Sequence, residues 1–227
     1  MPLSREDYLR VLSRDCARIG ELVAAQPLDT AVPGCPCWSV ADLLRHLGAV
    51  QRWATANVTG VPDERRAVPD DELAGWFTEG ATVLQTALGD ADPSAVCPGF
   101  DKVAATPGFW VRRMAHETLM HRLDVEDALG LAGEPLTAAQ ADDGIDEALH
   151  VFSPRQVVLG RSAGVPYALE IMTPGTTHRL DGPEPVVRVS GPAPAVLLRL
   201  WRRTDGAGLA VSDPEAFERV LASPLVP

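Results

Sequence analysis

The strongest constraint on the fold is a long helical pattern between residues 107 and 130 that carries polar side chains inside its apolar stripe. Pro107 is favoured in the first turn of a helix, and Gly130 is a natural stop. Between them, apolar positions recur at the spacing of a helix face that packs against a core. These positions are Val111, Met114, Thr118, Val125 and Ala128. The pattern predicts a helix within a helical bundle.

Glu117 and His121 lie inside that stripe. Residues four apart on a helix point the same way, so the carboxylate and the imidazole are directed together into the bundle interior. A buried carboxylate without a partner is costly. The pattern leaves three explanations: a bound metal ion, a buried Arg or Lys partner, or a helix rotated so that Glu117 reaches water.

His46 is the candidate third ligand for such a metal. It lies on or beside the apolar face of a second predicted helix, from Ser39 to about Asn57, and bundles build metal sites from facing helices. Two imidazole nitrogens and a carboxylate oxygen are ligands of catalytic zinc and other transition metals, with a position left open for water or substrate. In the metal-free alternative, Glu117 pairs with a core arginine and His121 donates to a carbonyl.

The pattern of the chain changes near residue 153. Helical patterns cover residues 4–27, 39–57, 70–89, 107–130 and 137–152. Short β-type runs follow at 165–172, 177–180, 186–189 and 209–211, with helices at 193–203 and 213–221. The change predicts an α+β protein of two domains: a helical bundle over residues 1–153 and a small α+β domain over residues 154–227 that packs against it.

Composition restricts the possible partners. The 227 residues are 46% hydrophobic and 22% charged, which is typical of an ordinary folded protein. The formal net charge of -11 opposes binding to nucleic acid and to anionic membranes. No apolar run reaches the roughly 18 residues of a membrane span, and the first residues lack the pattern of a signal peptide. We therefore expect a cytoplasmic monomer or small homo-oligomer that binds neither nucleic acid nor membrane.

The four cysteines do not form a disulfide framework typical of secreted proteins. Cys35-Pro36-Cys37 is shorter than the C-x-x-C of redox and zinc modules, and no second pair completes a four-cysteine site. We favour two small apolar residues in a turn before a helix over a catalytic or metal-binding role.

Two segments resemble the mycothiol-dependent maleylpyruvate isomerase family, which belongs to the wider DinB-like group of metal-binding helical bundles. They are CPCWSVADLLRHL, residues 35–47, and HETLMHRLDVE, residues 116–126. The stretch GPAPAVLLRLWRR, residues 191–203, resembles the second domain of the same family. The resemblance implies a DinB-like four-helix bundle with an extra helix, followed by the small α+β domain. Cys37 stands where glycine is usual in the family.

The resemblance implies that His46, Glu117 and His121 hold a divalent metal, usually zinc. Mycothiol, a small thiol of actinobacteria, would occupy the open position as a thiolate, because a metal-bound sulfur is deprotonated at neutral pH. It would attack a small electrophilic substrate. The reaction is a cis–trans isomerisation if the thiol then leaves, and an S-transfer if the adduct persists.

The resemblance also suggests residues around the metal. Arg122 and Asp124 match an R-x-D pattern of the family, Arg122 as a cofactor-binding residue and Asp124 as a catalytic or orienting residue. A salt-bridged helix surface is the alternative for both. Arg202 or Arg203 is the nearest match to a basic catalytic residue of the second domain, where arginine would orient a substrate carboxylate.

Two other functions remain open. A metal-dependent hydrolase would use the same three ligands to activate water and would turn over without a thiol. A non-catalytic protein would use the bundle as a pocket for a small ligand, with the metal structural or absent. Three ligands argue against a purely structural zinc, which is normally closed by four.

Overall fold

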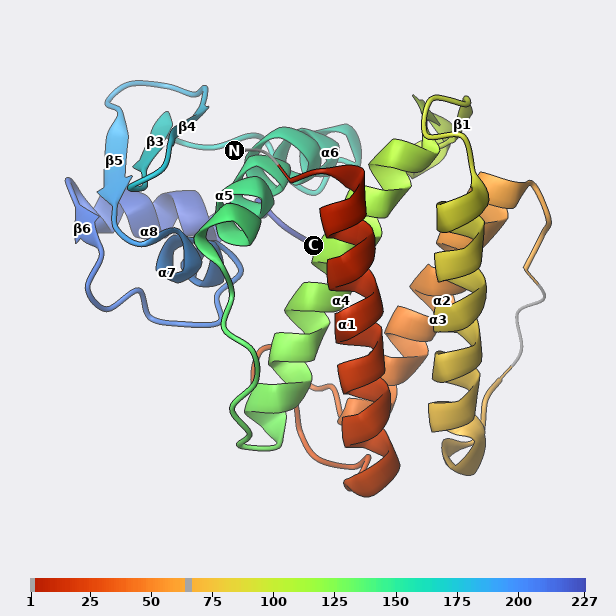
Figure 1. Cartoon of the computed structure of the whole chain (residues 1–227). Helices are drawn as coiled ribbons and strands as arrows, with labels where there is room; N and C mark the ends of the chain where they lie inside the picture. Colours follow the sequence, from red (N-terminus) through yellow and green to blue (C-terminus); the bar gives the residue numbers. More distant parts are fainter. Residues whose placement is uncertain (1–2, 64–66) are drawn as a thin grey trace. The chain divides into compact units, whose positions relative to one another are not determined.

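A computed structural model describes residues 3–63 and 67–227 of the chain (Figure 1). Its contacts divide these residues into two compact units, and each is described by itself. Ser4–Gly133 forms a helical unit, and Glu134–Pro227 forms an α+β unit. None of the helices in these ranges is long and apolar enough to cross a membrane.

The helical unit is a four-helix bundle. Its long helices are α1 (Arg5–Ala25), α2 (Val40–Thr59), α3 (Leu73–Asp90) and α4 (Pro107–Ala128). Helix α1 packs against α3 and α4, and α2 packs against the same two helices, so the four surround one core. Short elements between them are η1 (Asp70–Glu72), η2 (Phe100–Lys102) and the antiparallel pair β1 (Cys97–Pro98) and β2 (Ala104–Ala105). The predicted bundle is confirmed.

The first two bundle helices begin at capping boxes. The Ser4 hydroxyl accepts from the backbone N–H of Asp7 at 3.2 Å, and the Asp7 carboxylate accepts from the Ser4 N–H at 3.0 Å. Ser39 and Asp42 repeat this arrangement at the start of α2. Each cap satisfies backbone donors that the first helical turn leaves unpaired. The start of α2 is thereby defined, and with it the position of His46, almost two turns after Ser39.

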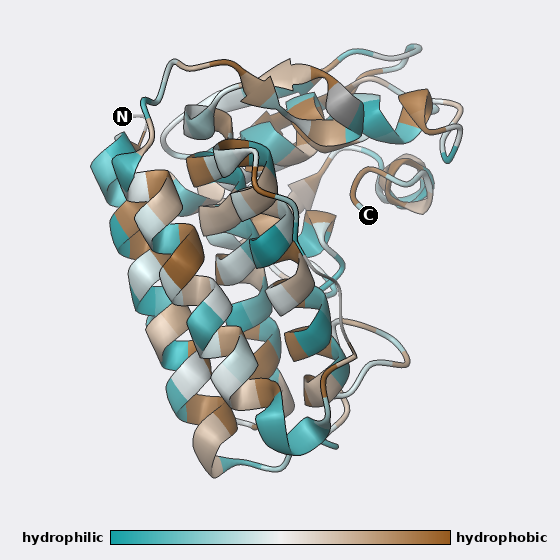
Figure 2. Ribbon diagram, turned by 90° about the vertical axis from the view of Figure 1, so that its right-hand side faces the viewer, coloured by the Kyte–Doolittle hydropathy of each residue, from teal (hydrophilic) through white to brown (hydrophobic). Residues whose placement is uncertain are grey.

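Each bundle helix buries one face. In Figure 2 hydrophobic and hydrophilic residues alternate along the bundle helices, as expected where one side faces a core. The core between α2, α3 and α4 includes Leu43, Leu47, Phe77 and Val125, all fully buried. Gly48 lets α3 approach α2 closely, because a Cβ there would lie 2.2 Å from the Trp76 ring.

The second unit is a small sheet with helices. Its elements are α5 (Ala138–Glu147), the π-helical turn η3 (Ala148–Phe152), α6 (Ser153–Val158), β3 (Leu169–Met172), β4 (Thr177–Leu180), β5 (Val187–Ser190), α7 (Ala193–Leu200), β6 (Ala210–Val211) and α8 (Pro214–Ala222). The strand order is β4-β3-β5-β6, with β3 and β5 parallel and the other pairs antiparallel. The predicted α+β class is confirmed.

The compact units divide at Gly133, whereas the sequence patterns placed the domain boundary between residues 153 and 154. Residue 153 lies inside an uninterrupted helical stretch that runs from α5 through η3 to α6. Helix α5 packs against α7, and its Asp142 accepts a hydrogen bond from Thr173 at 2.7 Å. The extra helix expected in the bundle is therefore part of the α+β unit. Its helical pattern resembles that of a bundle helix, and only its packing partner distinguishes it.

Candidate metal centre

His46, Glu117 and His121 come together where α2 faces α4. The Nε2 atom of His46 lies 2.9 Å from Oε1 of Glu117, and Nε2 of His121 lies 3.5 Å from the same oxygen. One ligand atom from each residue lies within 4.8 Å of the other two. The imidazole rings are nearly perpendicular, with centroids 5.2 Å apart. We call this cluster of His46, Glu117 and His121 the metal centre.

The metal centre is buried on one side and open on the other. The side chain of His46 is 37% exposed, whereas those of Glu117 and His121 are 14% and 10% exposed. A small molecule can therefore reach the cluster past His46. Two imidazole nitrogens and a carboxylate oxygen that already converge suit a divalent transition metal with room for a further ligand.

The second oxygen of Glu117 pairs with a core arginine, as the metal-free alternative expected, although the sequence analysis did not say which arginine. Arg113, one helical turn earlier and almost fully buried, places Nη2 2.6 Å from Glu117 Oε2. Burial by itself would raise the pKa of Glu117, but the charge of Arg113 and the hydrogen bonds of His121 and His46 hold it well below its usual range. Glu117 is therefore a carboxylate. The four-residue spacing was a signal from which this ion pair could have been predicted.

His121 is oriented by Asp124. Its Nδ1 lies 3.0 Å from Oδ2 of Asp124, whose side chain is buried, so its Nε2 faces Glu117. Burial alone would lower the pKa of His121, but hydrogen bonds with Asp124, Cys35 and Glu117 raise it well above its usual range. A carboxylate on one imidazole nitrogen fixes the ring and leaves the other nitrogen for a metal.

The turn before α2 forms a wall of the metal centre. The Trp38 ring centroid lies 4.9 Å from that of His46 and 6.3 Å from that of His121. Cys35 Sγ donates to Oδ2 of Asp124 at 3.5 Å. Cys37 is exposed and has the left-handed φ of 69°. Cys35 thus has a polar contact beside the site, whereas we expected only a small apolar residue in the turn.

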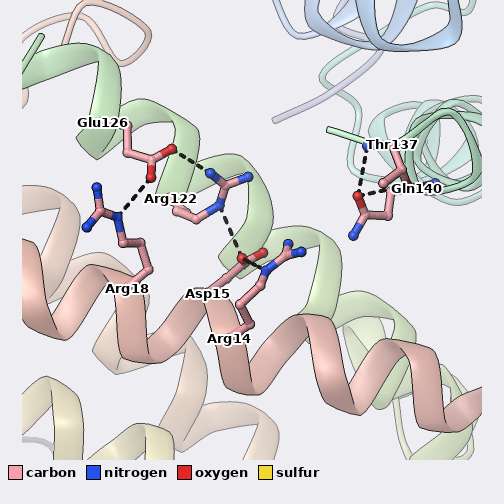
Figure 3. A network of polar contacts seen from close by, with 7 residues as sticks. All are labelled: Arg14, Asp15, Arg18, Arg122, Glu126, Thr137 and Gln140. Atoms are coloured by element: carbon pink, nitrogen blue, oxygen red, sulfur yellow. Dashed lines mark hydrogen bonds and ion pairs between the residues drawn. The ribbon is translucent and has the colours of Figure 1, made fainter. Parts of the chain in front are cut away.

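Arg122 lies in a buried ion network between α4 and α1 (Figure 3). Its Nε is 3.1 Å from Oδ1 of Asp15, and its Nη1 donates to Glu126. Arg14 and Arg18 add contacts of 2.8 Å to Asp15 and 3.2 Å to Glu126. We call these five residues the arginine network. The network joins two helices of the bundle, and the assignment of Arg122 to cofactor binding stays a prediction.

Arg202 and Arg203 follow α7 in the α+β unit. Arg202 has a φ of 57°, and its guanidinium donates to the backbone oxygen of Leu221. Arg203 donates to the backbone oxygen of Trp201 at 2.8 Å and lies 5.8 Å from that indole ring. Both side chains thus have contacts inside their own unit. Their catalytic role stays a prediction.

A cavity of about 630 Å³ begins at His46 and runs along α2 and α3. Two arginines, Arg45 and Arg52, and two indoles, Trp53 and Trp76, line it. Arg52 is held in place, because it donates to the backbone oxygen of Trp76 at 2.8 Å and stacks 4.0 Å from the Trp76 ring centroid. Asp63 also lines the cavity, and Glu79 lies 3.7 Å from Arg52. The guanidinium groups and indoles beside the metal centre are groups that can bind a small molecule with a carboxylate.

The chain resembles known proteins in sequence and in fold. Residues 9–126 match the family model described as mycothiol maleylpyruvate isomerase N-terminal domain. Crystal structures of the mycothiol-dependent maleylpyruvate isomerase and of a histidine-to-alanine mutant each match with a TM-score of 0.70 and 13% identity, over 92% of this chain and 93% of theirs. At that identity they show the fold alone. A comparison with curated protein sequences finds no match. Because the family model spans more than half of the sequence, this chain belongs to the mycothiol maleylpyruvate isomerase family of enzymes.

Proposed function

We propose that this protein is a divalent-metal-dependent enzyme that uses mycothiol to isomerise a small electrophilic substrate or to transfer the thiol to it. The convergence of His46 Nε2, Glu117 Oε1 and His121 Nε2 in a partly open cluster carries the proposal. Family membership supports mycothiol as the thiol and favours isomerisation. Zinc is the preferred metal for two imidazoles and a carboxylate.

When bound, the metal would supply a positive charge that keeps a coordinated thiol ionised near neutral pH. The residues of the chain prepare the ligands. Asp124 accepts the Nδ1 proton of His121, which leaves the Nε2 lone pair directed at the centre. Arg113 keeps Glu117 ionised through its other oxygen.

The substrate would enter through the cavity beside His46. Arg52 presents a guanidinium whose orientation is set by Trp76, and Arg45 lies nearer to solvent, where it pairs with Asp70. Guanidinium groups bind carboxylates through paired hydrogen bonds. A small carboxylate-bearing electrophile is therefore the substrate class that the cavity favours. Such local positive charge is needed because the whole protein is acidic.

The first experiment is metal content per chain, by elemental mass spectrometry on protein purified without chelator. The variants are His46→Ala, Glu117→Ala and His121→Ala, and the control is His150→Ala, an exposed histidine of the α+β unit. We expect near-stoichiometric metal in wild type and control, and almost none in the three variants. The circular dichroism spectra of the three variants should match that of wild type, which shows that they are folded. If wild type takes up no metal after reconstitution, the thiolate mechanism is wrong and a non-catalytic binding protein becomes the better explanation.

The number of turnovers per molecule of thiol then distinguishes the possible reactions. With maleylpyruvate as probe and mycothiol at a small fraction of its concentration, an isomerase completes many turnovers per thiol because the thiol is released. An S-transferase stops after one turnover per thiol. Turnover without any thiol would instead indicate a hydrolase that activates water.

A further inference from the structure

We propose a second cation site formed by Cys35, His121 and Asp124, which takes a thiophilic divalent ion and shares His121 with the metal centre. One ligand atom from each of the three residues lies within 4.8 Å of the other two. This site involves neither His46 nor Glu117. It therefore goes beyond the proposed function and can be tested where that function fails.

The two nitrogens of His121 face different groups of ligands. Nε2 lies 3.5 Å from Glu117 in the metal centre, whereas Nδ1 lies 3.0 Å from Oδ2 of Asp124. The sulfur of Cys35 is 3.5 Å from the same Asp124 oxygen. A sulfur, an imidazole nitrogen and a carboxylate oxygen thus converge on the far side of the ring. Each of these ligand types occurs in zinc sites, and the sulfur favours softer ions such as cadmium.

The surrounding turn holds Cys35 in place. The backbone N–H of Cys35 donates to Val32 at 3.1 Å, and Trp38 donates to the Cys35 carbonyl at 3.0 Å. The side chain of Asp124 is 1% exposed and that of His121 is 10% exposed, whereas Cys35 is half-buried. Two ligands are therefore positioned by the helix and the third by a hydrogen-bonded turn. An ion can approach from the side of the cysteine.

Sharing His121 couples the two sites. A neutral imidazole has one lone pair for a metal, so His121 serves either Glu117 and His46 through Nε2 or Cys35 and Asp124 through Nδ1. An ion at the second site takes the Nδ1 lone pair and sends the thiol proton to solvent, and the single proton of the neutral imidazole then lies on Nε2. We therefore expect a thiophilic ion there to weaken binding at the metal centre.

The test is a titration of metal-depleted protein with Cd²⁺, followed by the ultraviolet charge-transfer absorption of a sulfur–cadmium bond. Cys35→Ser removes the sulfur, and Cys37→Ser is the matched control two residues away. His46→Ala disables the metal centre alone. We expect the absorption in wild type, Cys37→Ser and His46→Ala, and its loss in Cys35→Ser, where any cadmium that still binds lies at the metal centre and has no sulfur ligand.

Either of two results would overturn the second site: absorption that persists in Cys35→Ser, or absorption that disappears in Cys37→Ser. If Cys35→Ser does not fold, ¹¹³Cd NMR of the wild-type protein decides instead. A resonance shifted as expected for one sulfur ligand supports the site, and resonances of nitrogen and oxygen ligands alone contradict it. The metal centre is judged separately, by the metal lost from Glu117→Ala.

Discussion

Helix α4 carries two clusters of buried charge that are paired in different ways. In the arginine network, Asp15 lies between Arg14 and Arg122, and Glu126 lies between Arg18 and Arg122 (Figure 3). Each carboxylate there has guanidinium groups on both sides. The network joins α4 to α1 by these ion pairs. Burial nevertheless raises the pKa of Asp15 above its usual value, and its Oδ2 is buried without a hydrogen-bond partner among the described residues.

The metal centre is different because histidines take the place of arginines. Oε1 of Glu117 faces His46 and His121, whereas Oε2 accepts a hydrogen bond from the guanidinium of Arg113. A neutral imidazole offers a lone pair to a metal, which a guanidinium cannot do. His121 and Arg122 are neighbours in sequence but point about 100° apart around the helix, so His121 contacts the His46 ring of α2 and Arg122 contacts Asp15 of α1. We therefore expect the arginine network to contribute stability and the proposed metal centre to bind a ligand.

The largest expected effect is on the arginine network. Asp15→Ala leaves the buried Arg122 with Glu126 as its remaining anion, so the free energy of unfolding should fall by about 3–5 kcal/mol. Metal stoichiometry should not change. Urea unfolding of metal-depleted protein measures the free energy of unfolding, and Asp127→Ala on the exposed face of α4 is the control. Loss of metal in Asp15→Ala, at intact fold, would contradict the separation of the two clusters.

Asp124→Asn should weaken metal binding with little loss of stability. The charge that holds the Nδ1 proton of His121 disappears, and changes of this kind lower metal affinity by about 10–100-fold. Competition with a chromophoric chelator measures the affinity. Arg18→Ala, which removes a partly exposed member of the arginine network, is the control and should keep wild-type affinity. Equal losses of metal affinity in Asp124→Asn and Arg18→Ala would show that the two clusters are not independent.

Metal affinity should rise with pH. The raised pKa of His121 means that metal-free protein holds a proton there at neutral pH, and a metal must displace it. That proton stabilises the metal-free fold below the ordinary pKa of 6.5, and the stabilisation is lost as pH rises through the raised value. Below the raised pKa, affinity should therefore increase by up to about tenfold per pH unit and then level off. Calorimetric titration at several pH values tests this, and an affinity independent of pH would show that His121 is neutral before the metal binds.

The smallest effect is expected at the rim of the arginine network. The side chain of Arg14 is 30% exposed, and Asp15 keeps Arg122 when Arg14 is removed. Arg14→Ala should lower the free energy of unfolding by about 1 kcal/mol or less. Thermal or urea unfolding of Arg14→Ala and Asp15→Ala, measured together, compares the two losses of stability. A loss as large as that of Asp15→Ala would mean that Arg14, rather than Arg122, holds the buried carboxylate.

Much of the bundle could be predicted from residues that are close in sequence. Ser39 and Asp42 mark the start of α2, and Thr106 with Pro107 marks the start of α4, because capping interactions join residues three apart. The unit to which α5 belongs could not be predicted in this way. Helix α5 belongs to the α+β unit because it packs against α7, and a helical pattern does not show which element the helix packs against.

In the candidate site, too, features within one helix could be predicted and contacts between distant residues could not. The four-residue spacing of Glu117 and His121 predicted that they point together, and the apolar face around His46 predicted that it joins them. The same spacing could have identified Arg113. Nothing in the local pattern placed Cys35 against Asp124, because 89 positions separate them.

Local patterns were enough to predict the four bundle helices and which side chains share a face of each helix, because these features depend on backbone geometry over one or two turns. They did not predict α6, which continues the helical stretch past residue 152. Tertiary packing was needed to show that His121 faces His46 of α2 while Arg122 pairs with Asp15 of α1. It likewise decided that Asp124 and Cys35 meet at Nδ1 of His121. The physical reason is that contacts between helices depend on how each helix is rotated and shifted against its neighbours. Those quantities are set by the packing of the whole core.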